Sequence, residues 1–315
     1  MSSVTPTNPT KFKTSLAQFY TWKNYQCAYE VITPTDADKN QKTPLLLIHP
    51  IGVGLSRNFW QRFSANWYQA GHHNLIYNPD LLGCGESDMP HVACTPNDWA
   101  EQLQEFLQNI VKRPVILIVQ GALFPVAIEL LQNTTISHLV TGVILSGPPA
   151  WPVITKKAEN WQQKLIWNLL DSPLGNAFYR YARGEKFLRS FSIRQLFAEE
   201  KQVDDEWLNM LNLGAKNMAS RYAVFAFLAR FWQKGYEQAI SQISQPTLVV
   251  LGNKASSISK SGTQETPEQR SQAYLKYLPK GETIFIPGRN VLPYESTAEF
   301  VQVVADFVDK IETKY

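Results

Sequence analysis

Cysteine is scarce in this sequence: Cys27, Cys84 and Cys94 are the only three among 315 residues. An odd number without a CxxC pair argues against a disulfide framework and against a zinc site. No spacing of His, Asp and Glu resembles a set of metal ligands either. The sequence therefore predicts no metal and no cofactor, and it favours a reducing compartment such as the cytoplasm.

Long apolar runs and an excess of charge are also missing. No window reaches the roughly 18 apolar residues of a spanning helix, and the polar segment 1–13 lacks the apolar core of a secretory signal. We expect no transmembrane segment, and we expect residues 1–16 to form a flexible leader. The formal net charge of +3 gives no electrostatic argument for nucleic acid as a partner.

The sequence does contain short apolar runs that alternate with helical patterns. Runs such as 45–48 and 115–119 are typical of strands buried on both faces. Further strands are expected at 19–25, 27–32, 75–77, 140–145, 247–251 and 283–286. Helices are expected at 57–69, 95–111, 122–132, 266–277 and 296–311, with Thr95 capping the second. This order predicts an α/β fold with a mostly parallel central sheet flanked by helices.

Residues 150–240 interrupt the alternation, because they read as several helices without a buried strand. We predict that they form an inserted helical cap. Residues 17–149 and 241–315 then form the core.

Four segments carry motifs that together suggest a known family. Residues 47–52 read LIHPIG, and residues 78–88 read NPDLLGCGESD. Residues 114–130 read as strand, turn and helix, and residues 286–295 begin with Ile-Pro-Gly. In this order they resemble the oxyanion turn, the PDLxGxGxSD turn, the nucleophile elbow and the histidine loop of the α/β-hydrolase superfamily. The resemblance runs from about residue 16 to the end, and it implies the α/β-hydrolase fold with a helical cap.

The resemblance also implies three catalytic positions, and this sequence departs from the family at each. Where the family reads G-x-S-x-G, residues 119–123 read VQGAL, so Gly121 stands at the nucleophile position. Ala255 stands where the family has its acid, and Val291 where it has its histidine. Acyl transfer needs a nucleophile, a base and a group that orients the base. Loss of the triad in a serine protease costs about 10⁶-fold in kcat.

We therefore expect a non-catalytic protein that binds a protein partner or an apolar small molecule through its cap and cleft. The alternative is a hydrolase or lyase with a non-standard catalytic constellation. His49 belongs to the oxyanion turn, and a structural role suits it better than a catalytic one. Ser146 fits a turn serine, and Cys84, without an adjacent base, fits a packed thiol.

The residues expected around the vacated triad form a candidate ligand site. Its polar members could hold an anionic or amide ligand, or they could be solvated loop residues. The candidates are His49, Pro50, Gln120, Gly121, Ala122, Lys254, Arg289, Asn290 and Val291.

The predicted cap is rich in aromatic residues, with basic residues among them. One interpretation is that most of these aromatics form the cap's own core. The other is that the stretch 178–197 presents a surface for a protein or for an anionic membrane. The candidate partner surface is Arg183, Lys186, Phe187, Arg189 and Phe191.

The amino-acid sequence of residues 78–90 and 146–152 resembles that of triad-less relatives from cyanobacteria and chloroplasts. This resemblance implies a cytoplasmic or stromal protein that contacts either thylakoid surfaces, peripherally, or photosynthetic assembly factors.

Overall fold

A computed structural model describes residues 12–14, 16–34 and 42–313. The described residues form one nine-stranded sheet in the order β1-β3-β5-β4-β6-β7-β8-β9, with β2 paired to β3. The strands from β5 to β9 are parallel, and β3 is antiparallel to its neighbours. The strands are β1 (Phe12–Thr14), β2 (Gln18–Trp22), β3 (Tyr25–Pro34), β4 (Leu45–Ile48), β5 (Ile76–Pro79), β6 (Val115–Gln120), β7 (Val140–Ser146), β8 (Thr247–Gly252) and β9 (Gly281–Ile286).

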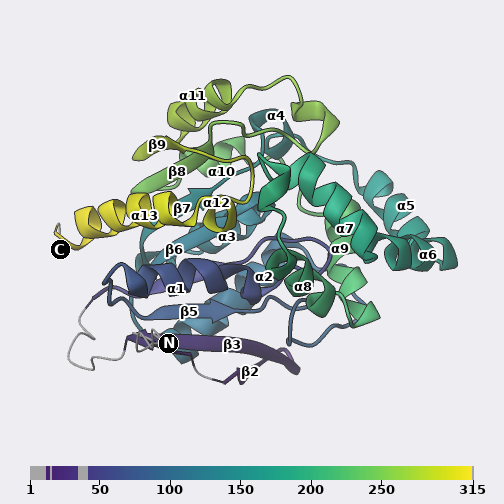
Figure 1. The fold of residues 1–315 in the computed structure, drawn as a ribbon, viewed down its shortest axis with the longest axis horizontal. Coiled ribbons are helices and arrows are strands. Elements are labelled where there is room, and N and C mark those ends of the chain that lie inside the picture. The colour runs from purple at the N-terminus through teal and green to yellow at the C-terminus, as the bar shows by residue number, and fades with distance from the viewer. Residues whose placement is uncertain (1–11, 15, 35–41, 314–315) are drawn as a thin grey trace, which may run out of the picture.

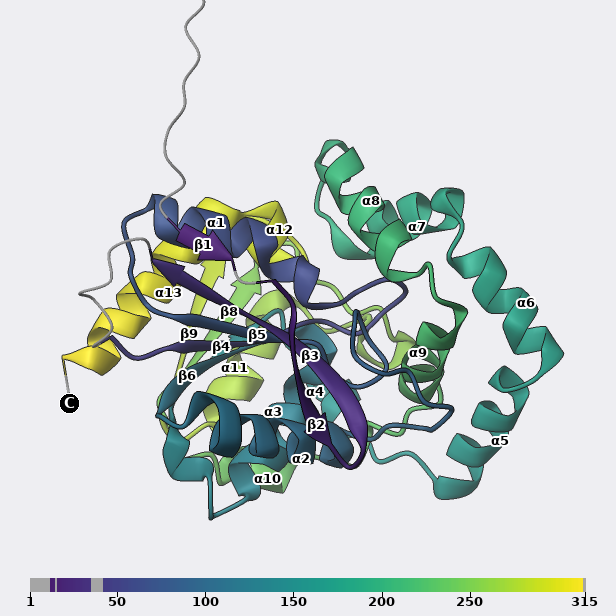
Figure 2. The same cartoon turned by 90° about the horizontal axis from the view of Figure 1, so that it is seen from below.

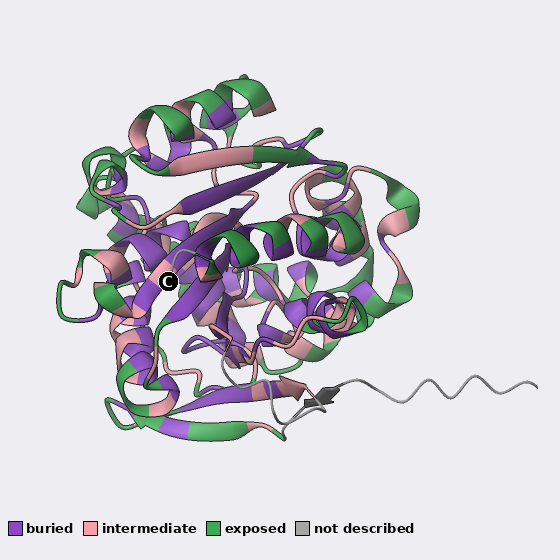
Figure 3. Ribbon diagram, turned by 90° about the vertical axis from the view of Figure 1, so that its left-hand side faces the viewer, coloured by how far each residue is buried: buried purple, intermediate pink, exposed green. Residues whose placement is uncertain are grey.

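Helices cover both faces of this sheet (Figure 1). Successive residues of one strand enter different apolar clusters, because side chains alternate across a strand. Leu117 packs in the cluster that includes helices α2, α3 and α11, whereas Ile118 packs in the cluster that includes α1 and α13. Figure 3 shows the central strands buried and the outward sides of the helices exposed. These helices are α1 (Gln61–Gln69), α2 (Pro96–Phe106), α3 (Phe124–Gln132), α11 (Pro267–Tyr277), α12 (Leu292–Glu295) and α13 (Thr297–Glu312).

The segment between β7 and β8 is helical. Figures 1 and 2 place its helices α5 to α8 together at one end of the sheet. They are α4 (Trp151–Ile154), α5 (Asn160–Leu170), α6 (Pro173–Ala182), α7 (Glu185–Phe191), α8 (Asp205–Gly214), α9 (Arg221–Leu228) and α10 (Glu237–Ser241), with a π-helical turn at Ser192–Leu196. The predicted α/β architecture with a helical insertion is confirmed, and we call residues 150–240 the cap.

The predicted start of α2 is also confirmed. The Asp98 backbone N–H donates to Thr95 Oγ1 at 3.3 Å, and the Thr95 N–H donates to Asp98 Oδ2 at 2.8 Å. This reciprocal pair satisfies N–H groups that have no acceptor within the helix.

Two predictions near the N-terminus need correction. The first hairpin turns at Lys23 and Asn24, which both have positive φ, and not between the predicted runs 19–25 and 27–32. Such a two-residue turn matches the twist of the strands that it joins. Phe12–Thr14, assigned above to a leader, pair with β3, because the open edge of β3 offers backbone partners. The rest of the predicted leader, apart from Leu16, lies outside the described residues.

Candidate functional site

The turn after β6 has the geometry of an exposed elbow. Gly121 follows the strand with a φ of +64°, a conformation that glycine adopts without the steric cost that other residues incur. A Cβ built on Gly121 would have no atom within 4 Å. The position therefore faces open space, yet it carries no side chain.

The other two triad positions carry apolar side chains. Ala255 follows β8 and is only 5% exposed. Val291 is 3% exposed and packs in the apolar cluster shared with α1 and α13. Neither position offers a group that can accept or donate a proton.

Asn290 brings the three triad loops together. Its backbone carbonyl accepts a 2.7 Å hydrogen bond from Gln120 Nε2, and its side-chain Oδ1 accepts one of 3.4 Å from the Ser256 N–H. Gln120, Ser256 and Asn290 each stand next to a triad position, at 121, 255 and 291. The loops that follow β6, β8 and β9 therefore meet at Asn290.

The remaining polar candidates turn toward the cap or toward solvent. Arg289 Nη1 donates to the Arg194 carbonyl at 2.6 Å, and Asn290 Nδ2 donates to the Gln195 carbonyl at 2.7 Å. Lys254 is exposed. Arg289 and Asn290 thus bind backbone of the π-helical turn in the cap.

His49 directly follows β4 and is fully buried. Its Nε2 accepts a 3.1 Å hydrogen bond from the Leu81 N–H, so the ring proton resides on Nδ1, which donates to the Pro50 carbonyl at 2.7 Å. Burial lowers the pKa of His49. Both ring nitrogens therefore hold backbone groups of neighbouring loops.

Two polar atoms near the elbow are buried without a partner. Among the described residues, neither Gln120 Oε1 nor Ser146 Oγ has a hydrogen-bond partner. The two residues are neighbours across β6 and β7, and Gly121 and Ala122 beside them are only partly buried. Unpaired buried polar atoms are uncommon, and they are costly unless something binds them.

The turn at 78–88 is built around the buried carboxylate of Asp80, which pairs with Arg57. Asp80 accepts from the Arg57 N–H at 2.8 Å and from the Glu86 N–H at 2.9 Å, and it pairs with the Arg57 guanidinium. A Cβ on Gly85 would lie 2.1 Å from Asp80 Oδ2. Burial raises the pKa of the Cys84 thiol in the same turn. These contacts support the structural roles expected for this turn.

The cap is attached directly to the histidine loop and to the oxyanion turn. Glu295 Oε2 accepts from the Ala198 N–H at 2.9 Å, and burial raises the pKa of this carboxyl. A Cβ on Gly54 would lie 2.0 Å from the Leu211 carbonyl oxygen of α8. In this conformation, α8 closes over the turn that follows β4.

Some residues of the candidate partner surface, on and beside α7, already form hydrogen bonds within the cap. Arg183 donates to the Lys216 carbonyl and Arg189 to the Val203 carbonyl, each at 3.3 Å. Lys186 is exposed. Phe187 and Phe191 stack with ring centroids 6.0 Å apart.

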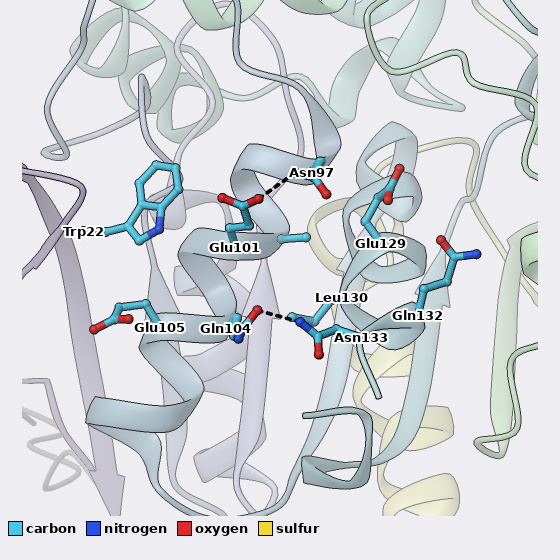
Figure 4. Close-up of a pocket in the computed structure, with 10 residues that line it drawn as sticks. Trp22, Asn97, Glu101, Gln104, Glu105, Glu129, Leu130, Gln132 and Asn133 are labelled. Atoms are coloured by element: carbon cyan, nitrogen blue, oxygen red, sulfur yellow. Dashed lines mark hydrogen bonds between the residues drawn. The ribbon is translucent and has the colours of Figure 1, made fainter. Parts of the chain in front are cut away.

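A surface cavity of about 560 Å³ lies between α2 and α3 and was not predicted from the sequence. Figure 4 shows its lining, which includes Glu101, Glu105 and Glu129. Glu129 is paired with Lys234 at 2.8 Å. The cavity touches the last residues of α3, the end of that helix away from Gly121.

The described residues contain neither a candidate metal-binding cluster nor a helix that could span a membrane. They contain no group of three or more His, Cys, Asp or Glu side chains that could hold a metal ion. No helix within 12–14, 16–34 and 42–313 is long and apolar enough to cross a membrane.

Comparisons with known proteins agree with this architecture. The structure is similar to a thermophilic esterase from Thermogutta terrifontis, at 17% identity over 94% of this chain and 99% of that chain, with a TM-score of 0.70. It is also similar to an esterase from Exiguobacterium antarcticum, at 16% identity over 93% and 100% of the two chains, with a TM-score of 0.69. An enol-lactonase from Burkholderia xenovorans LB400 shares 11% identity over 93% and 100%, with a TM-score of 0.68. At such identities these likenesses show the fold alone.

None of the curated protein sequences matches this one. The model of the alpha/beta hydrolase family matches residues 45–303. This match spans most of the chain and includes all three triad loops, so the chain belongs to the α/β-hydrolase family.

Proposed function

We propose that this chain is a non-catalytic α/β-hydrolase that binds a protein partner or an apolar ligand through its cap and the cleft predicted at the elbow. The observation that carries the proposal is Gly121, which occupies an open elbow tip without a nucleophile. Ala255 and Val291 supply neither acid nor base. Because these positions carry no nucleophile, no acid and no base, we propose that the site binds a ligand and does not catalyse a reaction.

The unpaired atoms beside the elbow support a ligand there. Gln120 Oε1 can accept a hydrogen bond and Ser146 Oγ can donate one. A mostly apolar molecule with one amide or hydroxyl group would satisfy both atoms. Native mass spectrometry of the purified protein, followed by extraction, tests this directly. A bound small molecule that is lost in the Gln120→Leu variant would support the proposal.

The surface of Arg183, Lys186, Phe187, Arg189 and Phe191 is the proposed partner contact. Lys186→Glu is the cleanest test, because Lys186 is exposed whereas Arg183 and Arg189 also hold backbone carbonyls. Weaker capture of a partner by Lys186→Glu than by the wild type would support it. Equal capture would remove this surface from the proposal.

A reactive probe separates binding from catalysis. We expect no labelling by a fluorophosphonate and no turnover of p-nitrophenyl esters above buffer, with an active esterase as the positive control. Labelling that disappears in Ser146→Ala would overturn the non-catalytic proposal.

One contact favours the alternative, a hydrolase or lyase with a non-standard constellation. His91 Nε2 lies 2.7 Å from Asp171 Oδ2 where the core meets the cap, and an imidazole paired with a carboxylate can act as a base. Activity toward any ester or lactone that falls at least about a hundredfold in His91→Gln would support this alternative.

We also propose, from the sequence resemblance of residues 78–90 and 146–152 alone, a cytoplasmic or stromal location at the thylakoid surface. Cofractionation with thylakoid membranes and release by a salt wash would support it. Recovery only in the soluble fraction would count against it.

A further inference from the structure

Two helices of the cap present large apolar side chains to solvent. On α5 these residues are spaced four positions apart, and on α6 the spacings are four and then three. Each set therefore lies along one side of its helix. The exposed residues are Trp161 (64%), Leu165 (61%), Leu169 (58%), Leu174 (71%), Phe178 (40%) and Tyr181 (68%). Monomeric soluble proteins rarely expose so many neighbouring apolar groups without a partner for them.

The opposite sides of these helices already have partners within the cap. Tyr179 of α6 is fully buried and packs edge-to-face on Phe225 of α9, with ring centroids 5.9 Å apart. Gln163 of α5 is buried and donates to the Arg230 carbonyl at 2.9 Å. The helices are therefore held in place by one side, and the exposed apolar side is left free.

The charges on α5 and α6 themselves are of one sign, although exposed Glu159 and Asp171 flank α5 at its two ends. Neither α5 nor α6 contains an Asp or Glu, whereas Lys164 and Arg180 lie on them and are exposed. Lys157 precedes α5 and is also exposed. The intervening Asp171 is paired with His91 at 2.7 Å.

The position of the two helices limits what can cover them. Figures 1 and 2 both place α5 and α6 at the outer rim of the cap, away from the sheet. A second copy docked face to face would add its own Lys164 and Arg180 to the same interface, and like charges on one interface repel. A negatively charged surface avoids this cost.

We propose that the apolar side of α5 and α6 inserts into an anionic lipid surface, with Lys164 and Arg180 at the phosphate level. Leucine and phenylalanine side chains favour the acyl boundary, and tryptophan and tyrosine favour the interface. Basic residues beside such helices add attraction to anionic headgroups. This proposal names a partner for the cap, so it rests on the binding role proposed above, but it does not depend on the state of the triad.

A vesicle-binding assay on the full chain tests the proposal. We expect the protein to sediment with vesicles that contain phosphatidylglycerol and to bind vesicles of pure phosphatidylcholine at least about tenfold more weakly. The variant Lys164→Glu/Leu165→Glu should bind anionic vesicles more than about tenfold more weakly. It removes one basic residue that attracts the headgroups and one apolar side chain that inserts among the acyl chains. Circular dichroism should show unchanged folding, since both side chains are exposed.

A matched control comes from α11 on the core. Leu275→Glu/Lys276→Glu makes the same chemical change at an adjacent exposed pair, and we expect binding within about twofold of the wild type. Brominated phosphatidylglycerol gives a second readout. It should quench part of the tryptophan fluorescence, and Trp161→Phe should abolish that part.

Three results would overturn the proposal. They are no sedimentation with anionic vesicles, equal losses in the two double variants, and quenching that survives Trp161→Phe. Dimerisation of the wild type that Lys164→Glu/Leu165→Glu abolishes, without vesicle binding, would assign the face to a second copy instead. None of these results bears on the fluorophosphonate test, so this inference and the non-catalytic proposal can fail separately.

Discussion

The side-chain amide of Gln120 donates a 2.7 Å hydrogen bond to the backbone carbonyl of Asn290, 170 residues away. This contact links the end of β6, beside the elbow tip, to the loop where the family carries its histidine. Asn290 continues the connection, because its Nδ2 donates to the Gln195 carbonyl in the cap. Amide contacts thus join the elbow, the histidine loop and the cap.

Removing the Gln120 amide should destabilise the protein. Gln120→Leu keeps a similar volume but leaves the Asn290 carbonyl, in a part-buried contact, without its donor, and the loss of such a hydrogen bond costs about 0.5–1.5 kcal/mol. Urea unfolding followed by tryptophan fluorescence measures the loss. Lys254→Ala, at an exposed residue of a neighbouring loop, should stay within about 0.5 kcal/mol of the wild type. Equal stabilities of Gln120→Leu and the wild type would show that this contact is dispensable.

A serine at the elbow should fit without restoring chemistry. Gly121→Ser places its Cβ in open space, so the positive φ alone should cost about 1–2 kcal/mol. We expect a folded variant that a fluorophosphonate does not label, because Val291 cannot take the serine proton. Intact-mass spectrometry after exposure to the probe checks this, and an adduct would mean that another base reaches position 121.

Two glycines allow strain and steric clash to be separated. Gly85 and Gly71 both have positive φ, but a Cβ on Gly85 would lie 2.1 Å from Asp80 Oδ2, whereas one on Gly71 would meet nothing within 4 Å. Gly71→Ala should cost about 1–2 kcal/mol from strain alone. Gly85→Ala should cost at least about 3 kcal/mol more, because it disrupts the buried Arg57–Asp80 pair. Thermal denaturation of the two variants gives the comparison, and similar losses would refute this role for Gly85.

His49 should make stability depend on pH. Burial lowers the pKa of His49 from the ordinary value of 6.5, so the unfolded chain takes up the proton first as the pH falls. The stabilisation is complete above pH 6.5 and is lost below it, at up to about 1.4 kcal/mol per pH unit until the folded pKa is reached. Urea unfolding between pH 7.5 and 5.5 should show a shallower slope for His49→Gln than for the wild type. His138→Gln, at an exposed residue, should keep the wild-type slope.

Most strands and the start of α2 could be predicted from the sequence, and so could the candidate triad positions 121, 255 and 291, because each depends on residues close together in the chain. A short apolar run predicts a strand buried on both faces, and Thr95 with Asp98 predicts a helix start within four residues. Which polar groups meet could be seen only in the folded chain. Nothing near Asn290 in the sequence indicates that its partners are Gln120, Ser256 and Gln195, since those contacts arise when separate loops fold onto one sheet edge.

The same distinction applies to the cap. The aromatic composition left open whether these residues form a core or a surface, and both occur: Tyr179 is fully buried, whereas Tyr181, two positions later, is 68% exposed. Helical periodicity shows which residues share a side of a helix, but it does not show which side another element covers. That choice depends on how α6 packs against α9, and packing is a property of the folded chain.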